Sequence, residues 1–240
     1  MIWALKNSEK IEATPDTRAI CPLCSQEVLS KCGEINKWHW VHVKKESCDS
    51  WYESETDWHY HWKMTFGKEN AEVIIRKENE YHIADIMTLN NVVIELQNSP
   101  IQKKVIAQRE EFYGKKLIWL INGEKFAQNF STYNEEYEDY LWNNEDSKPK
   151  KKILRKSFLA TEWSFDWKYN RKTWKEVKRP VFIDFGDEDL FWVKEGMGKY
   201  WGEGIWVAKE MFIRKYGGSV EYLRKTCLLQ RRTNESETIK

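Results

Sequence analysis

The chain has 240 residues, of which 41% are hydrophobic and 32% are charged, with 39 basic and 38 acidic side chains. The net charge of +1 excludes a protein that attracts nucleic acid by its overall charge, so any DNA-binding surface must be local. No apolar run approaches the roughly 20 residues of a membrane span, and the N-terminus lacks the long apolar region of a signal peptide. We therefore expect a cytoplasmic protein without a membrane partner, with one large domain or two small ones.

Four of the five cysteines lie within residues 21–48. Cys21 and Cys24 form a CxxC, and fourteen residues separate it from an HxxH formed by His39 and His42. Two thiolates and two imidazoles make a closed tetrahedral zinc site. An odd number of cysteines with a CxxC suits a metal site in a reducing compartment better than a disulfide framework. We predict that these four residues bind one structural zinc ion.

Two further cysteines of this segment, Cys32 and Cys48, are rival ligands. The segment 37–42 looks like a strand or turn rather than a recognition helix, which favours a structural knuckle over a site that reads bases. Cys227 is isolated, and we assign it no role.

Residues 54–121 alternate helical and strand patterns. A helix is predicted at 55–66, with Ser54 at its start and Gly67 at its end. Strands are predicted at 72–76, 81–86 and 92–97. A second helix starts at Ser99 and ends at Gly114, and a buried-type strand follows at 116–121. The order is helix, three strands, helix, strand.

Two acidic residues stand near the ends of consecutive predicted strands, Asp85 on one and Glu95 on the next. Their flanks are strongly apolar, and buried carboxylates are costly unless they are paired or bound to metal. Two converging carboxylates are what a divalent metal needs to be held against a phosphodiester. We therefore predict that Asp85 and Glu95 bind Mg²⁺ or Mn²⁺.

The turn between these strands decides whether the two carboxylates share a face. A two-residue turn at Asn90 and Asn91 would put Asp85 opposite Leu96 and the two carboxylates on opposite faces. A bulged or odd-numbered turn pairs Asp85 with Glu95, and asparagine tolerates the left-handed backbone that such a turn uses. We predict the second geometry.

Three polar residues, Glu55, His59 and Lys63, are spaced four apart on one face of the first predicted helix. This face could complete the metal site, and a solvated helix face is an equally favoured interpretation. Glu72 is either a further ligand or a salt-bridge partner, and His82 is assigned to packing or surface.

These residues carry a resemblance to a known family. The order of elements and the acids resemble the PD-(D/E)xK restriction-endonuclease-like core, and residues 1–122 more closely resemble the competence protein CoiA-like family. The motifs that carry this resemblance are Cys21-Pro22-x-Cys24, His39-x-x-His42, Glu55-x3-His59-x3-Lys63, Ala84-Asp85 and Ile94-Glu95-Leu96-Gln97-x-Ser99.

We therefore predict a mixed α/β (α+β) fold in three parts. Residues 1–50 are N-terminal strands and a zinc knuckle, and residues 51–122 are a PD-(D/E)xK-like nuclease core. Residues 123–240 are an aromatic and basic, Trp-rich α+β C-terminal domain.

The resemblance implies a metal-dependent DNA nuclease, an Mg-dependent deoxyribonuclease acting in DNA uptake, recombination or defence against foreign DNA. Its catalytic residues would be Asp85, Glu95 and Gln97, with Glu55, His59 or Lys63 completing the site. Gln97 stands where the superfamily usually has lysine, and an amide can orient a water but supplies no positive charge. Lys63 is the candidate for that charge.

The alternative function is a non-catalytic zinc-containing DNA-binding or adaptor protein with a decayed nuclease core. Gln97 favours this alternative, whereas retention of Asp85 and Glu95 favours the enzyme. The expected partner is DNA, single-stranded or branched as well as duplex. A homodimer and a recombination or defence partner protein remain open.

The C-terminal half is rich in aromatic residues, and the whole chain has 14 Trp, 11 Tyr and 10 Phe. Strands are predicted at 157–161, 181–185 and 190–193, and a helix at 210–216, with turns at Gly196, Gly198, Gly202 and Gly204. The stretch 171–179 interleaves basic side chains with a tryptophan, which suits contacts to the phosphates and bases of single strands. A solvated loop is favoured for a second basic cluster at 148–156.

Overall fold

The computed structural model describes residues 1–34, 37–44, 48–51, 53–143 and 160–222 of the chain. The fold is mixed α+β, with two sheets and few helices. Two compact units divide the chain, residues 1–94 with 213–240 and residues 95–212. The basic cluster at 148–156, most of the strand predicted at 157–161, and Cys227 lie outside the described residues. Within the described part of the chain, no helix is both long and apolar enough to cross a membrane.

The first unit begins with a five-stranded antiparallel sheet. Its strands are β1 (Trp3–Lys6), β2 (Glu9–Glu12), β3 (Arg18–Ile20), β4 (Glu27–Lys31) and β5 (His39–His42), in the order β2-β1-β3-β4-β5. Val28 and Trp40 are fully buried in the small core of this sheet. Ile74 and Ile83 also pack against this core.

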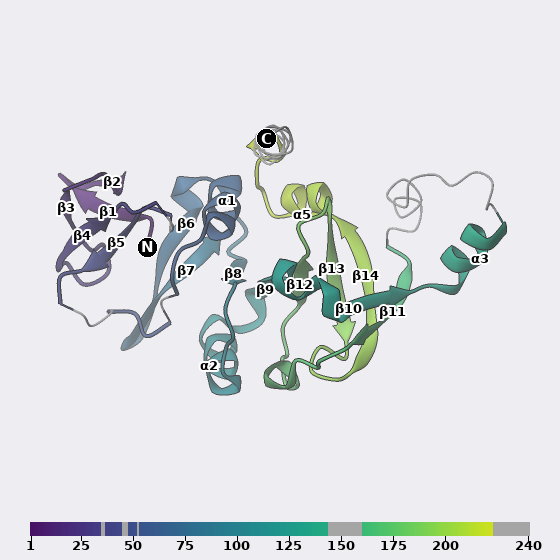
Figure 1. Ribbon diagram of the computed structural model, residues 1–240. Coiled ribbons are helices and arrows are strands. Elements are labelled where there is room, and N and C mark those ends of the chain that lie inside the picture. The colour runs from purple at the N-terminus through teal and green to yellow at the C-terminus, as the bar shows by residue number, and fades with distance from the viewer. Residues whose placement is uncertain (35–36, 45–47, 52, 144–159, 223–240) are drawn as a thin grey trace. The chain divides into compact units, whose positions relative to one another are not determined.

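A helix and a hairpin follow the sheet in the first unit. They are α1 (Asp57–Phe66), the short 3₁₀ helix η1 (Lys68–Asn70), β6 (Ala71–Lys77) and β7 (Glu80–Met87), and α1 packs on both strands (Figure 1). Thr56 rather than Ser54 caps α1, because its Oγ1 accepts a hydrogen bond from the His59 backbone N–H at 3.4 Å. Gly67 ends α1 with a φ of 88°, as predicted.

The turn after β7 has the predicted odd-numbered geometry. Met87 pairs with Val93 and Ile86 with Ile94 at the start of β8 (Val93–Gln97), which leaves five residues in the turn. Asn91 adopts the left-handed conformation, with a φ of 57°, and its N–H donates to the Thr88 carbonyl. The predicted order of helix, three strands, helix and strand is present in the chain.

In the second unit, β8 is followed by α2 (Lys103–Tyr113), η2 (Gly114–Lys116), β9 (Leu117–Asn122), η3 (Glu124–Asn129), β10 (Phe130–Tyr133) and α3 (Glu135–Asn143). Further along are β11 (Glu162–Trp167), η5 (Lys172–Trp174), β12 (Val181–Asp184), β13 (Asp189–Glu195) and β14 (Trp201–Ala208). The last helix, α5 (Lys209–Lys215), begins in the second unit and ends in the first, to which residues 213–222 belong. The strand order here is β10-β11-β14-β13-β12-β9-β8. The start of α2 differs from the prediction, because Gln102 rather than Ser99 is its N-cap residue.

The two units do not follow the predicted boundaries at residues 50 and 122, for two reasons. The five-stranded sheet shares its core with Ile74 and Ile83 of the following hairpin, and both lie in the first unit. Strand β9 pairs in parallel with β12, Trp119 beside Val181, and so belongs to the C-terminal part of the chain. Sequence-local patterns cannot reveal such non-local pairings.

Aromatic rings form the core of the second unit. Phe130 packs against Phe165 and Phe191, with ring centroids 5.4 and 5.0 Å away. Gly202 and Gly204 lie within β14, and not in turns as predicted. A Cβ at either position would lie only about 2.5 Å from the ring of Phe165 or Phe191, so a larger residue would not fit. The glycines therefore make room for large rings in a sheet.

Candidate functional site

Four side chains that can bind a metal come together in the first unit. They are those of Cys21, Cys24, His42 and Cys48, and their ligand atoms all lie within 4.8 Å of one another. Cys21 Sγ lies 3.6 Å from Cys48 Sγ, and Cys24 Sγ lies 3.3 Å from His42 Nε2. A tetrahedral zinc ion bound to sulfur and nitrogen separates its ligand atoms by about 3.4–3.8 Å. The donor set and its spacing therefore fit one structural zinc ion.

His39 does not belong to this cluster, which corrects one of the four predicted ligands. It lies on the same strand as His42, three residues earlier, and residues three apart on a strand point to opposite faces. Its Nδ1 instead lies 2.7 Å from the Lys37 carbonyl oxygen. Cys48, the rival ligand in the sequence, occupies the fourth position.

The Cys21 sulfur accepts a hydrogen bond from the backbone. Leu23 donates its N–H to Cys21 Sγ at 3.4 Å, and Ser25 turns the chain with a φ of 58°. Burial raises the pKa of the Cys21 thiol and lowers the pKa of His42. A neutral imidazole is the form that binds metal, whereas a thiol must lose its proton to bind.

A second cluster surrounds Lys63, whose side chain is 2% exposed. Lys63 Nζ lies 2.7 Å from Glu55 Oε1, 3.0 Å from Glu72 Oε1 and 3.2 Å from Asp85 Oδ1. Glu55 is on the segment before α1 rather than on the helix face that we predicted, yet it still meets Lys63. His59 is buried on α1, and its Nδ1 lies 2.8 Å from Thr56 Oγ1.

Glu72 is held in an unusual backbone conformation within this cluster. Its φ is 49°, which a residue with a side chain adopts at a cost of about 1–3 kcal/mol. Its carboxylate accepts hydrogen bonds from the backbone N–H groups of Ile2 and Trp3 at 2.7 and 3.1 Å. The fold therefore fixes this carboxylate beside Lys63.

The charges of the cluster reinforce one another. Burial alone would lower the pKa of Lys63, but Glu55, Glu72 and Asp85 raise it well above its usual value. Burial would likewise raise the pKa of Glu55, whereas Lys63 holds it below its usual value. Lys63 is therefore an ammonium at neutral pH. Asp85, with a side chain 22% exposed, is the carboxylate of this cluster with the most access to solvent.

Glu95 and Gln97 belong to the second unit, and both are buried. Glu95 Oε2 lies 2.7 Å from Arg109 Nη1, in an ion pair that the sequence did not suggest. Gln97 Nε2 donates to the Ser99 carbonyl at 2.9 Å. The shared metal between Asp85 and Glu95 remains a prediction.

Carboxylate oxygens suit Mg²⁺ or Mn²⁺ chemically, but the observed contacts do not support a preformed site for either ion. Asp85 contacts the Lys63 ammonium, and Glu95 contacts the Arg109 guanidinium. Three carboxylates do meet in the first unit, but they meet at the Lys63 ammonium. Among the described residues, the only group with the spacing of metal ligands is Cys21, Cys24, His42 and Cys48.

His82 makes contacts that the sequence did not reveal. Its Nδ1 lies 2.9 Å from Asp49 Oδ1, and its ring stacks on Trp51 with centroids 3.2 Å apart. Asp49 directly follows Cys48 and also accepts a hydrogen bond from the Ile83 N–H at 2.8 Å. The Asp49 carboxylate therefore connects the residue after Cys48, the last member of the Cys/His cluster, to β7. The only sign of this contact in the sequence was the acidic residue Asp49 directly after Cys48.

Comparison with known proteins supports the resemblance in the N-terminal part. Residues 4–50 match the family model described as competence protein CoiA, N-terminal domain. The similarity to this family therefore covers residues 4–50, the segment that contains the Cys/His cluster. No curated protein and no solved structure matches the chain.

Proposed function

We propose that this CoiA-like chain is a metal-dependent DNA nuclease with a PD-(D/E)xK restriction-endonuclease-like core, acting in competence-related DNA processing. The observation that carries the proposal is the position of Lys63 Nζ, 3.2 Å from Asp85 Oδ1. The superfamily pattern calls for a cation beside the acidic residues, and Gln97 cannot provide it. Lys63 would supply that charge from the preceding helix.

The environment of Lys63 defines its role in this proposal. Because the surrounding carboxylates raise its pKa, Lys63 keeps its proton and cannot act as a general base at neutral pH. A fixed ammonium instead stabilises negative charge that develops on a phosphoryl oxygen. Asp85, the least buried of the three carboxylates, is the one that substrate or a divalent cation would approach. The strained backbone of Glu72 supports a functional role, because such strain gathers at functional sites.

A nuclease assay tests the proposal. We would incubate the purified chain with single-stranded, duplex and branched DNA, with Mg²⁺ or Mn²⁺. Asp85→Asn and Glu95→Gln should abolish cleavage, whereas Gln97→Ala should cost less, because a neutral hydrogen bond is worth roughly 0.5–1.5 kcal/mol. Glu69→Gln, an exposed acid near the end of α1, is the matched control and should cleave at the wild-type rate.

Wild-type cleavage by Asp85→Asn, with contaminating nuclease excluded, would refute this mechanism. The second candidate is the non-catalytic zinc-containing adaptor, favoured by the ion pairs that Lys63 and Arg109 make with Asp85 and Glu95. A wild-type protein that binds DNA but cleaves none of these substrates would establish that candidate instead.

A further inference from the structure

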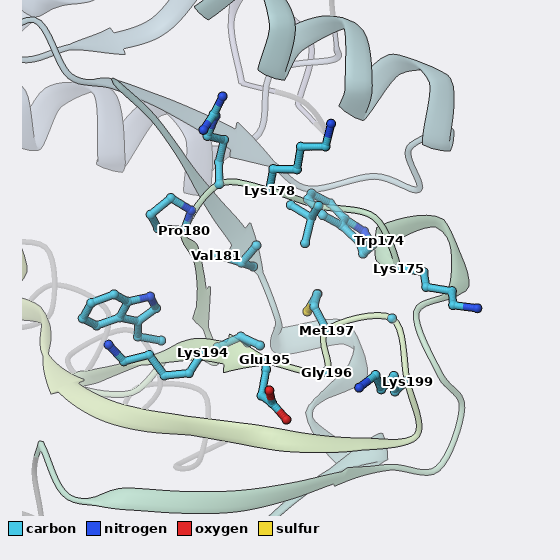
Figure 2. Close-up of a pocket in the computed structure, with 15 residues that line it drawn as sticks. Trp174, Lys175, Lys178, Pro180, Val181, Lys194, Glu195, Gly196, Met197 and Lys199 are labelled. Atoms are coloured by element: carbon cyan, nitrogen blue, oxygen red, sulfur yellow. The ribbon is translucent and has the colours of Figure 1, made fainter. Parts of the chain in front are cut away.

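The second unit contains a pocket of about 420 Å³ with a strongly basic lining (Figure 2). Its charged lining residues are Lys175, Lys178, Arg179, Lys194, Lys199 and a single acid, Glu195. The whole chain carries a net charge of only +1, so this excess of positive charge is local. Because the chain as a whole is nearly neutral, any nucleic-acid site must be a local basic surface of this kind.

The pocket joins two segments that are distant in sequence, residues 174–181 and residues 192–199. They meet at Gly198, where a Cβ would lie 2.3 Å from the Lys175 Cα. The buried carboxylate of Glu110 fixes the first segment, because it accepts hydrogen bonds from the backbone N–H groups of Lys178 and Arg179 at 3.0 Å. The basic residues therefore stand on a braced backbone rather than on a free loop.

The pocket has an apolar floor and a cationic rim. Trp174, Val181 and Met197 are buried, whereas the four lysines of the lining are exposed. Figure 2 shows Lys175 and Lys194 on opposite sides of Val181 and Met197, with Lys178 on a third side. Because the cations surround the floor instead of converging on one point, they suit an anion with several separated charges better than a single phosphate ion.

Aromatic side chains adjoin these cations. Lys194 Nζ lies 3.3 Å from the centroid of the half-buried Trp192 ring. Directly after Lys199, Tyr200 and Trp201 are 57% and 59% exposed. Exposed rings beside basic side chains are the combination that binds single-stranded nucleic acid, because bases stack on the rings while cations neutralise the phosphates.

We infer that this basic pocket binds the sugar–phosphate backbone of single-stranded nucleic acid, with neighbouring bases stacked on the aromatic rings. An anionic membrane fits less well, since the apolar side chains form a recessed floor rather than a protruding surface. The inference goes beyond the proposed nuclease activity, because the binding requires neither cleavage nor a divalent metal.

Fluorescence anisotropy with a labelled oligothymidylate of about 16 nucleotides, without added divalent metal, tests the inference. The variant Lys178→Gln/Lys194→Gln/Lys199→Gln should bind at least about tenfold more weakly, and the slope of log affinity against log salt should fall by about 2, at roughly 0.7 per lost phosphate contact. Trp201→Ala should weaken binding by about fivefold or more, through lost stacking.

The matched control is Lys104→Gln/Lys115→Gln/Lys125→Gln, which removes three exposed lysines of the same unit that do not line the pocket. Near wild-type binding by this control, with loss in the pocket variant, supports the inference. Equal binding by the pocket variant and the wild type, or an equal loss in both variants, would overturn it.

Failure to bind the oligonucleotide, with pocket-dependent binding to phosphatidylglycerol vesicles, would assign the pocket to a membrane and also overturn the inference. Binding that persists in a protein without nuclease activity would leave the inference intact while the proposed function fails.

Discussion

At the residue scale, the choice between Cys48 and His39 defines the metal cluster. Both were candidate ligands in the sequence, and both lie in the described part of the first unit. Cys48 Sγ lies 3.6 Å from Cys21 Sγ, whereas His39 contacts the Lys37 carbonyl. The alternation of side chains along β5 decides between them.

Zinc content should therefore depend on Cys48 and not on His39. We expect about one zinc per chain in the wild type and in His39→Ala, since four ligands complete a structural site. Cys48→Ala should lose most of its zinc, because three ligands hold the ion much less tightly. Elemental analysis of the purified proteins measures this. Zinc loss in His39→Ala with retention in Cys48→Ala would contradict the ligand set.

Lys63 should be essential for stability as well as for the proposed activity. Lys63→Gln leaves several buried carboxylates without their cation, which costs about 3–5 kcal/mol when one partner of a buried pair is removed. Urea denaturation of the variant gives the change in unfolding free energy. Lys6→Gln, an exposed lysine of the same unit, should change it by less than about 0.5 kcal/mol. Equal effects of the two substitutions would count against a buried ion-pair network.

Low pH should weaken the ion pairs around Lys63, because it protonates the Glu55 carboxylate. Its pKa in the folded chain is lower than the ordinary value of 4.5, so its stabilising contribution is complete above pH 4.5 and is lost as the pH falls toward the lowered pKa. Glu55→Gln should therefore flatten the dependence of unfolding free energy on pH below about 4.5. Urea titrations at a series of acid pH values test this, and an unchanged slope would show that Glu55 does not contribute.

At the element scale, glycines in β14 allow the aromatic core to form. A Cβ at Gly204 would lie 2.5 Å from the Phe191 ring and from the Trp192 carbonyl oxygen. The sequence suggested turns at Gly202 and Gly204 because glycine is common in turns. Only the neighbouring strands reveal that these residues make room for rings.

Gly204→Ala should destabilise the chain by about 1–3 kcal/mol, the usual cost of overpacking a core. Gly33→Ala is the control, since a Cβ there has no neighbour within 4 Å among the described residues. Thermal unfolding followed by circular dichroism compares the two variants. A Gly204→Ala protein as stable as the Gly33→Ala protein would mean that the rings can move apart easily.

The helix and hairpin of the first unit illustrate how local signals and non-local contacts combine. Gly67 ends α1 as its sequence predicted. The odd-numbered turn was predicted from the requirement that Asp85 and Glu95 share a face, and from the tolerance of asparagine for a left-handed backbone. The helix starts two residues later than expected, because Thr56 is the residue whose side chain caps it. Glu55 therefore reaches Lys63 from a loop.

At the scale of the whole molecule, zinc should stabilise the first unit. A structural metal site couples ion binding to folding, and cooperative units open separately. Removing zinc with a chelator should increase hydrogen exchange in β1–β5 and leave β9, β12 and β13 protected, because these strands belong to the second unit. Mass spectrometry of peptic peptides follows this exchange. Equal loss of protection in both units would contradict separate cooperative units.

The sequence by itself determined the mixed fold class, the element order from α1 to β9, the CoiA-like N-terminal segment and three of the four cluster ligands. These features depend on local periodicity, turn residues and short spacings, which a linear chain displays directly. Tertiary structure decided the replacement of His39 by Cys48, the joining of Lys63 with three carboxylates and the meeting of two basic segments at one pocket. Each of these arises from contacts between residues distant in sequence, which burial and strand pairing fix only when the chain folds.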